Sequence, residues 1–310
     1  MARPQVLLLL AVAACGRSAV DPFGAGGGGG DAWGADDGDD RGGRDERGGA
    51  DGADDGADDS ADGGDGTVQT CEQIDFLFVI DDSNSMGNNQ AKLAANYRVI
   101  LDGVWASIDT IDSMHLGVIT TDAYAFNSPG CQTLGGLVSV TGGLGSSAAN
   151  CGPFSSGESY MTEEDDLDIA FPCAARVGIA GSGSEQPLLA SISALTPPLT
   201  SEGGCNESFL RRNALLVLVF LTDEDAAMDP QEAALIVTEL KPRGVDDVVA
   251  VVVAHGSDGQ CPLNGSATVA HRLEAFAGWF PHAFVGPICA QYYDEMFDDV
   301  VAAIQGACPG

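Results

Sequence analysis

Four short apolar runs constrain the fold of this chain more than any other feature. Each is rich in Val, Ile, Leu or Phe and shows no alternation with polar residues; they cover residues 76–80, 116–120, 215–221 and 248–253. Such runs are typical of parallel strands that are covered on both faces, because neither face then needs polar side chains. We therefore expect a central sheet that is mostly parallel.

Helical patterns lie between and after these runs. Apolar residues recur at helical spacing in two segments, at Leu93, Tyr97, Ile100, Leu101, Val104 and Ile108, and at Met296, Phe297, Val300, Val301 and Ile304. A further helix is expected from Pro230 to about Leu240, and another over 268–278, before a last strand near 283–288. Strands that alternate with helices predict a doubly wound α/β sheet flanked by helices.

The first fifteen residues, MARPQVLLLLAVAAC, have the pattern of a secretory signal peptide. Arg3 precedes an apolar segment over 6–12 that is too short to span a membrane as a helix. The ending VAAC resembles a bacterial lipobox, which implies cleavage before Cys15 and lipid attachment to it. Because Gly16 follows in place of Asp, the same resemblance favours the outer membrane of a bacterial envelope. Both the periplasmic and the surface-exposed face of that membrane remain open. An ordinary signal peptide with a chance cysteine is the alternative.

Residues 16–70 form a Gly/Asp/Ala tract, which holds fifteen acidic residues against four arginines. Almost nothing in it can be buried, so we expect a disordered tether extended by its own charge. Calcium binding by the aspartate repeats is the alternative, although no spacing matches a defined calcium loop.

The net charge of the whole chain is −33. Phosphates would be repelled, which argues against nucleic acid or an anionic membrane surface as a partner. The membrane is therefore expected to meet this chain through the lipid alone. The same charge suits a surface that binds cations.

Beyond Cys15 the chain has eight cysteines, an even number that predicts disulfides in an exported protein. They are Cys71, Cys131, Cys151, Cys173, Cys205, Cys261, Cys289 and Cys308, and none forms a C-x-x-C motif. Three of them lie in residues 125–184, a Gly- and Ser-rich stretch that is long for a connection. We expect this stretch to be an insertion tied by disulfides, with a short strand at 135–140.

Polar residues follow two of the apolar runs directly. Asp81, Ser83 and Ser85 come after the run 76–80, and Asp223 comes after the run 215–221. Ligands of open α/β sheets collect beyond the carboxyl ends of the strands. Carboxylate and hydroxyl oxygens suit Mg²⁺, Ca²⁺ or Mn²⁺ better than zinc. The alternatives are that Asp81, Ser83 and Ser85 cap the following helix and that Asp223 belongs to a solvated loop.

The segments FLFVIDDSNSM and VFLTD resemble the D-x-S-x-S and T-D motifs of the von Willebrand factor A (vWA) family, and the resemblance covers about 71–310. It implies a metal-ion-dependent adhesion site in which Ser83 and Ser85 bind the ion directly. Asp81 and Asp223 would balance its charge, through water or as direct ligands. Mg²⁺ is the expected ion, with Ca²⁺ and Mn²⁺ as alternatives.

Two positions depart from the family pattern. The family's further threonine ligand has no clear counterpart; Glu185 is the nearest oxygen donor, and Thr121 is a rival. Glu224 stands where the family usually has glycine.

The resemblance also bears on the disulfides, because the two ends of a vWA domain lie close together. It implies a Cys71–Cys308 pair. We further expect Cys131–Cys151 to close the insertion, Cys173–Cys205 to bracket the helix near residue 185, and Cys261–Cys289 to tie helix 268–278 to the last strand.

Enzyme motifs such as G-x-S-x-G and H-E-x-x-H are absent from the sequence. The histidines are expected to be structural or exposed, and Asp81 with Asp223 lacks a nucleophile for acid–base work. We therefore expect no enzyme but a lipid-anchored adhesion or protein-binding module, similar to Cys-rich vWA lipoproteins of bacterial surfaces. Its ion would take a carboxylate from a protein or polysaccharide ligand. A metal-dependent hydrolase with Glu224 as base and a structural envelope protein with a vestigial site remain as alternatives.

Overall fold

A computed structural model describes residues 71–263, 265 and 267–308. The expected signal peptide, the lipidation site Cys15 and the expected tether over 16–70 lie outside the described residues. The vWA-like domain predicted for 71–310 coincides almost entirely with the described part.

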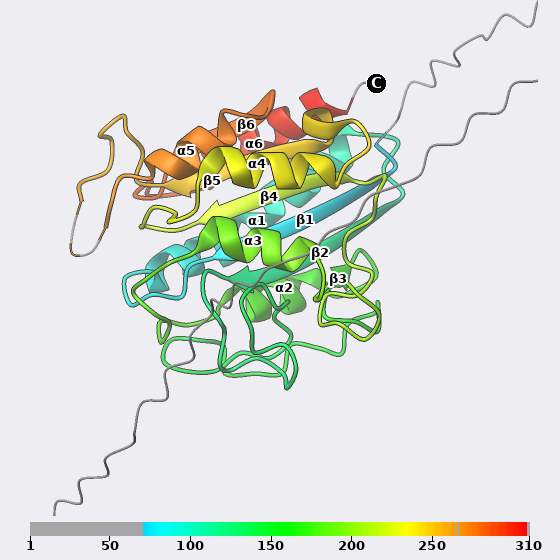
Figure 1. Ribbon diagram of the computed structural model, residues 1–310, viewed down its shortest axis with the longest axis horizontal. Helices are drawn as coiled ribbons and strands as arrows, with labels where there is room; N and C mark the ends of the chain where they lie inside the picture. Colours follow the sequence, from blue (N-terminus) through cyan, green and yellow to red (C-terminus); the bar gives the residue numbers. More distant parts are fainter. Residues whose placement is uncertain (1–70, 264, 266, 309–310) are drawn as a thin grey trace, which may run out of the picture. The chain divides into compact units, whose positions relative to one another are not determined.

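A six-stranded sheet in the order β3-β2-β1-β4-β5-β6 forms the centre of the domain (Figure 1). Its strands are β1 (Gln73–Ile80), β2 (Ser113–Thr120), β3 (Met161–Thr162), β4 (Leu215–Leu221), β5 (Val248–Ala254) and β6 (His282–Pro287). All neighbours pair in parallel except β3, which pairs antiparallel with β2. The four apolar runs are thus confirmed as strands of a mostly parallel sheet.

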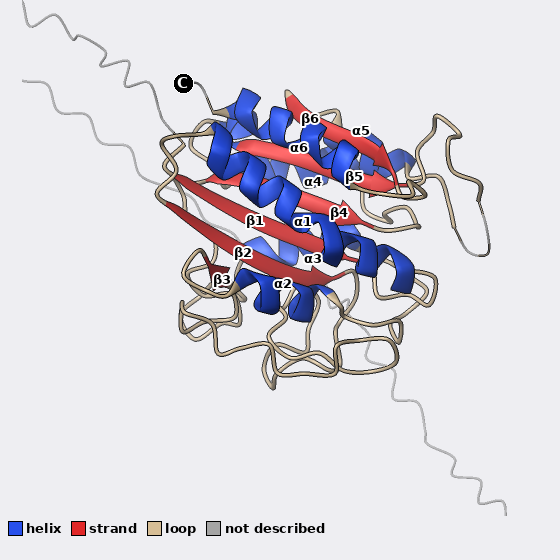
Figure 2. Cartoon of the chain, turned by 180° about the vertical axis from the view of Figure 1, so that it is seen from behind, coloured by secondary structure: helices blue, strands red, loops and turns tan. Residues whose placement is uncertain are grey.

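Helices cover both faces of the sheet, as expected for an α/β fold. They are α1 (Gly87–Ser107), α2 (Leu167–Ala175), α3 (Pro187–Leu195), α4 (Pro230–Glu239), α5 (His271–Ala277) and α6 (Asp294–Ala307), with a 3₁₀ turn at Gly244–Asp247. Helices α1, α2 and α6 pack on one face (Figure 2), and α3, α4 and α5 pack on the other (Figure 1). Successive residues of β1 alternate between these two cores: Phe76 and Phe78 face the first, and Leu77 and Val79 the second. A strand buried on both sides explains why its sequence shows no polar alternation.

The insertion differs from the prediction. Residues 135–140 form no regular strand. Val138 N donates to the carbonyl of Val118 in β2 (2.8 Å), but its neighbours donate to side-chain carboxamides, Leu137 N to Asn206 Oδ1 (2.9 Å) and Ser139 N to Asn127 Oδ1 (3.2 Å). The left-handed backbone of Gly135 (φ 82°) also interrupts an extended path. The insertion supplies β3 and α2 instead. Both are short, and Pro172 inside α2 obscures its helical pattern.

Four disulfides link the eight cysteines. Cys71–Cys308 and Cys261–Cys289 are present as expected, whereas the other two predicted pairs are wrong: the structure has Cys131–Cys205 and Cys151–Cys173. The reason lies in how the insertion folds. Asn206 binds the 135–137 turn, which brings Cys205 to Cys131, while Ser147 Oγ donates to the carbonyl of Cys173, which draws α2 toward the 147–151 segment.

Within the described part of the chain, no helix combines the length and apolarity that crossing a membrane requires.

Candidate metal centre

Three neighbouring parallel strands bring the predicted residues to one edge of the sheet. Since β1 lies between β2 and β4, the loops that follow these strands leave the sheet at the same edge (Figure 1). The prediction that Asp81 and Asp223 share this edge depended on β1 and β4 being neighbours, and they are. The segment before α3 joins them, because Gln186 N donates to the carbonyl of Thr121 (2.9 Å).

Asp81 is fully buried and organises the first loop. One carboxylate oxygen accepts from Ser83 N (2.7 Å) and the other from Thr222 Oγ1 (2.7 Å). Burial, with a smaller contribution from Asp223, raises the pKa of Asp81 to about 6. The carboxylate therefore lies in a setting that favours a nearby positive charge.

The two serine hydroxyls lie side by side, with Ser83 Oγ 3.2 Å from Ser85 Oγ. Neither caps the following helix: the N-cap of α1 is Met86, which makes no side-chain capping bond. The capping alternative for this loop is thus wrong. Both hydroxyls remain able to turn their lone pairs toward a common ion.

Asp223 and Glu185 complete the edge, and both side chains are buried. Glu185 accepts a hydrogen bond from Thr121 Oγ1, so the two rival candidates for the further ligand are in contact. Burial, and next the charge of Asp81, raises the pKa of Glu185 to about 9. Glu224 is half-buried, and its backbone N–H donates to Thr222 Oγ1 (3.1 Å).

Carboxylate oxygens without partners are concentrated at this edge. Among the described residues, five buried side-chain N or O atoms lack a hydrogen-bond partner, and four are the carboxylate oxygens Asp82 Oδ1, Asp122 Oδ1, Glu185 Oε1 and Asp223 Oδ1. No Lys or Arg of the described chain forms an ion pair with any of these four residues. Buried groups of this kind are costly unless they are paired or coordinate a cation.

The candidate ligands at this edge include both hydroxyls and carboxylates. In the described ranges, no three side chains of His, Cys, Asp or Glu are grouped so that they could hold a metal ion by themselves. A cation at this edge would therefore use the hydroxyls of Ser83 and Ser85 together with carboxylates. Oxygen-only sets of this kind match Mg²⁺, Ca²⁺ and Mn²⁺.

Sequence reasoning missed three residues of this edge. Asp122 follows β2 as Asp223 follows β4, so the same strand-end rule would have found it. Asp82 is the variable position inside D-x-S-x-S. Gln90 has no sequence signal: its buried amide donates to the carbonyls of Asp81 (2.9 Å) and Gly178 (2.7 Å), and so joins α1, the first loop and the end of the insertion.

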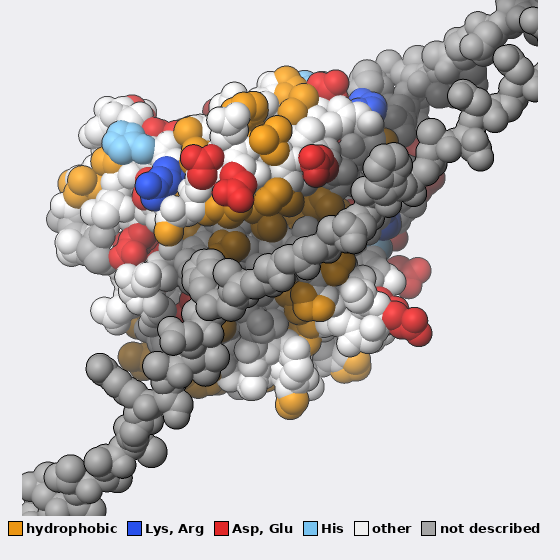
Figure 3. All heavy atoms as spheres, viewed as in Figure 1, with side chains coloured by type: hydrophobic (Ala, Val, Ile, Leu, Met, Phe, Trp, Pro, Cys, Tyr) orange, Lys and Arg blue, Asp and Glu red, His pale blue; other side chains and the backbone are white. Residues whose placement is uncertain are grey.

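An apolar pocket of about 320 Å³ lies beside the edge, lined by Gln186, Leu189, Ala227 and Met228. Figure 3 shows hydrophobic side chains gathered between α3 and α4, with acidic side chains spread over the face around them.

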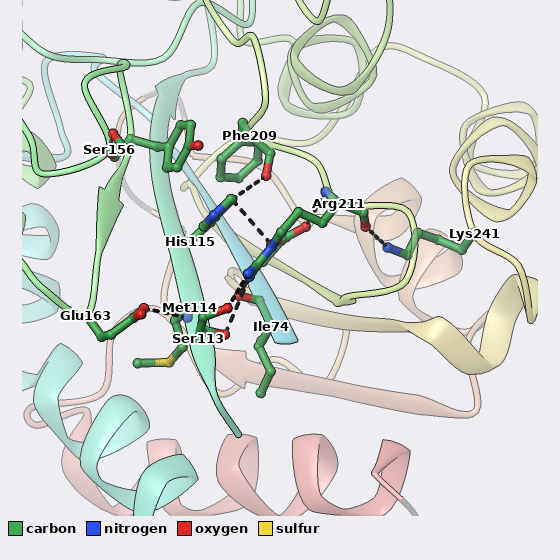
Figure 4. Close-up of polar contacts among 11 residues, drawn as sticks. Ile74, Ser113, Met114, His115, Ser156, Glu163, Phe209, Arg211 and Lys241 are labelled. Atoms are coloured by element: carbon green, nitrogen blue, oxygen red, sulfur yellow. Dashed lines mark hydrogen bonds and ion pairs between the residues drawn. The ribbon is translucent and has the colours of Figure 1, made fainter. Parts of the chain in front are cut away.

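A second charged cluster, at the opposite end of the strands, has a different character (Figure 4). The buried carboxylate of Asp75 accepts from the backbone N–H and from Nε of Arg211, each at 2.7 Å. Lys241 Nζ donates to the carbonyl of Arg211 (2.8 Å), and His115 Nδ1 lies 2.8 Å from the carbonyl of Phe209. Asp75 and Arg211 thus form an ion pair, whereas Lys241 and His115 contact backbone carbonyls. These internal contacts fit the expectation that His115 is structural.

Comparisons with known proteins add little. No protein-family model matches this chain, and no curated protein matches it. Among solved structures, it is similar to proximal thread matrix protein 1 (PTMP1) from the mussel byssus, with 15% identity and a TM-score of 0.38 over 77% of this chain and 47% of that one. The chain thus spans less than half the length of that protein, and a likeness of this degree carries no argument about function.

Proposed function

We propose that residues 71–310 are a vWA-type binding module, without catalytic activity, that holds one divalent cation at the carboxyl edge of the sheet. Ser83 and Ser85 would bind the ion directly, with Asp81 and Asp223 balancing its charge and Glu185 as a further ligand. The observation that carries this proposal is the unpaired buried oxygens of Asp223 and Glu185 at the same edge as two adjacent hydroxyls. Mg²⁺ is the ion proposed, with Ca²⁺ and Mn²⁺ as alternatives.

The ion would serve as a docking point for a carboxylate of the partner. A chain with a net charge of −33 repels a broadly acidic partner. This repulsion is screened beyond about 8 Å at physiological salt, whereas coordination acts at contact. The partner is therefore a protein or polysaccharide that presents a single Asp, Glu or acidic sugar.

The insertion would influence which partner binds. Its last residues reach the same edge, where Gly181 N donates to the carbonyl of Asp82 (2.9 Å) and Ser182 N to Asp122 Oδ2 (2.8 Å). Exchange of loops within 125–184 should change the partner without abolishing metal binding.

The test is a pull-down from bacterial envelope extracts with and without Mg²⁺, combined with calorimetric titration of Mg²⁺. Capture should require the ion, survive moderate salt, and be lost in Asp81→Ala and Ser83→Ala. Ser201→Ala is the matched control, because Ser201 is exposed and distant in sequence from every residue of the site. Capture that persists in EDTA and disappears only at high salt would contradict the docking role.

Two other outcomes separate the alternatives. Metal-dependent turnover of a substrate that is lost in Glu224→Gln would favour the hydrolase. Absence of cation binding in the intact protein would favour a structural envelope protein.

The location proposed is the outer membrane of a bacterial envelope, through a lipid on Cys15. The mature chain should begin at a modified Cys15 and fractionate with the outer membrane, and Cys15→Ala should release it or block its processing. Mass spectrometry that finds an unmodified terminus further downstream would exclude the lipid anchor.

A further inference from the structure

Asp82, the variable position of the D-x-S-x-S segment, contacts a different part of the molecule from Asp81. Its side chain is 2% exposed, and its Oδ1 has no hydrogen-bond partner. The backbone of Gly181 packs directly on its carboxylate: a Cβ at Gly181 would lie 2.4 Å from Asp82 Cγ and 2.6 Å from each carboxylate oxygen. Only a residue without a side chain fits here.

Asp122 brings a second carboxylate to the same place. Its Oδ2 accepts from Ser182 N (2.8 Å), and its buried Oδ1 is unpaired. Because Gly181 and Ser182 are consecutive, the carboxylates of Asp82 and Asp122 both lie against one short stretch of backbone. Asp82 and Asp122 therefore each have one buried carboxylate oxygen without a hydrogen-bond partner, near the negative charge of the other.

These two carboxylates contact different neighbours from those of the Asp81 carboxylate. Asp81 bonds to Thr222, which follows β4, whereas Asp82 contacts Gly181, next to Asp122, which follows β2. Since β1 separates β2 from β4, the first and second aspartates of the loop serve different neighbours.

We propose that Asp82 and Asp122 hold a second divalent cation, separate from the one at Ser83 and Ser85. The ion best suited is Ca²⁺, which accepts irregular oxygen coordination completed by water. Like charges that are buried together need a positive charge between them, and the described chain offers no Lys or Arg in an ion pair with either. The inference uses residues outside the proposed adhesion site and does not depend on that proposal.

A shared proton could meet the same electrostatic need, so the experiment must distinguish a bound ion from a proton.

The number of Ca²⁺ ions bound per chain tests the inference. The disulfide-bonded protein, freed of metal with EDTA, is titrated with Ca²⁺ alone in a calorimeter. Wild type should bind one Ca²⁺ ion at Asp82 and Asp122, in addition to any ion held at Ser83 and Ser85. Gly181→Ala, whose methyl group displaces the Asp82 carboxylate, and Asp122→Asn, which removes a charge at a half-exposed position, should each lose one. Gly183→Ala is the matched control and should bind as many ions as wild type, because a Cβ at Gly183 meets nothing within 4 Å.

A further variant separates this inference from the proposed function. The double variant Ser83→Ala/Ser85→Ala lacks the hydroxyls of the first site. It should still bind the ion at Asp82 and Asp122, which Gly181→Ala loses. Equal numbers of Ca²⁺ ions bound by wild type, Gly181→Ala and Asp122→Asn would overturn the second site. This is the result expected if the two carboxylates share a proton in place of an ion. Thermal unfolding in EDTA shows whether each variant is folded.

Discussion

At the scale of single residues, the acidic groups of this edge divide into two kinds. Both oxygens of Asp81 are occupied by donors from its own chain, so Asp81 shapes the loop as well as adding charge. Asp223 and Glu185 each keep a buried oxygen without a partner. The oxygens of Asp81 thus stabilise the folded loop, whereas the unpaired oxygens of Asp223 and Glu185 are available to a ligand.

We predict that Asp81→Ala abolishes the rise in unfolding temperature that Mg²⁺ produces. In metal-free protein it should also lower the free energy of unfolding by roughly 1–3 kcal/mol, because Ser83 N–H and the Thr222 hydroxyl lose their acceptor. Thermal unfolding with Mg²⁺ and with EDTA measures both effects. Equal Mg²⁺ stabilisation of wild type and Asp81→Ala would show that the ion is held elsewhere.

Glu185 gives a prediction about pH. Its pKa rises from 4.5 to about 9 in the folded, metal-free chain, so the folded state binds more protons than the unfolded state between these values. The stability of metal-free protein should therefore fall as the pH rises through this window. Denaturant unfolding in EDTA from pH 5 to 9 should show the decline, and Glu185→Gln should make it shallower, while the raised pKa values of Asp81 and Asp82 leave the remainder. A wild-type profile as shallow as that of Glu185→Gln would remove Glu185 as its cause.

At the scale of elements, the insertion is held by side chains rather than by regular strands. Asn206 is fully buried and makes three hydrogen bonds: it accepts from Leu137 N and donates to the carbonyls of Gly135 and Ala194. One side chain thus joins the insertion to the end of α3 and to the segment before β4.

Asn206→Ala should destabilise the domain by roughly 2–3 kcal/mol, because buried backbone groups lose their partners. Asn150→Ala, at an exposed position of the same insertion, should change the free energy of unfolding by less than about 0.5 kcal/mol. Chemical denaturation of both variants under non-reducing conditions provides the comparison. Similar values for the two would show that Asn206 does not hold the insertion.

At the scale of the whole domain, the two ends of the strands have opposite electrostatic characters. At one end, the buried Asp75 is paired with Arg211. At the other end, four buried carboxylate oxygens of the described chain lack hydrogen-bond partners, a setting that favours a bound ion or proton. Cys71–Cys308 joins the start and end of the domain and leaves the carboxyl edge open.

Peptide mapping without reduction should recover Cys71–Cys308, Cys131–Cys205, Cys151–Cys173 and Cys261–Cys289. Replacing Cys71 and Cys308 together by Ser should cost about 5 kcal/mol in the chain-entropy model, since the pair closes a loop of 237 residues. Recovery of a Cys131–Cys151 peptide would contradict the fold of the insertion described above.

The sequence alone determined the α/β class, the strands of the sheet, and the presence of Asp81, Ser83, Ser85 and Asp223 at strand ends. These follow from local patterns: an apolar run buried on both faces needs no information from elsewhere, and polar residues directly after it must leave the sheet at its carboxyl edge. Two disulfides were also expected correctly: the resemblance to the vWA family implied Cys71–Cys308, and Cys261–Cys289 spans a single short unit.

Only the tertiary structure decided which insertion cysteines pair, that 135–140 forms no strand, and that Asp82 and Asp122 lie against the same backbone. Each of these depends on groups far apart in sequence; Asn206 and Leu137, for example, are 69 residues apart. The path of a Gly- and Ser-rich loop is set by such distant side-chain bonds, and no local periodicity reports them. For the same physical reason, the unpaired carboxylate oxygens on which both proposed ions depend became visible only in the folded chain.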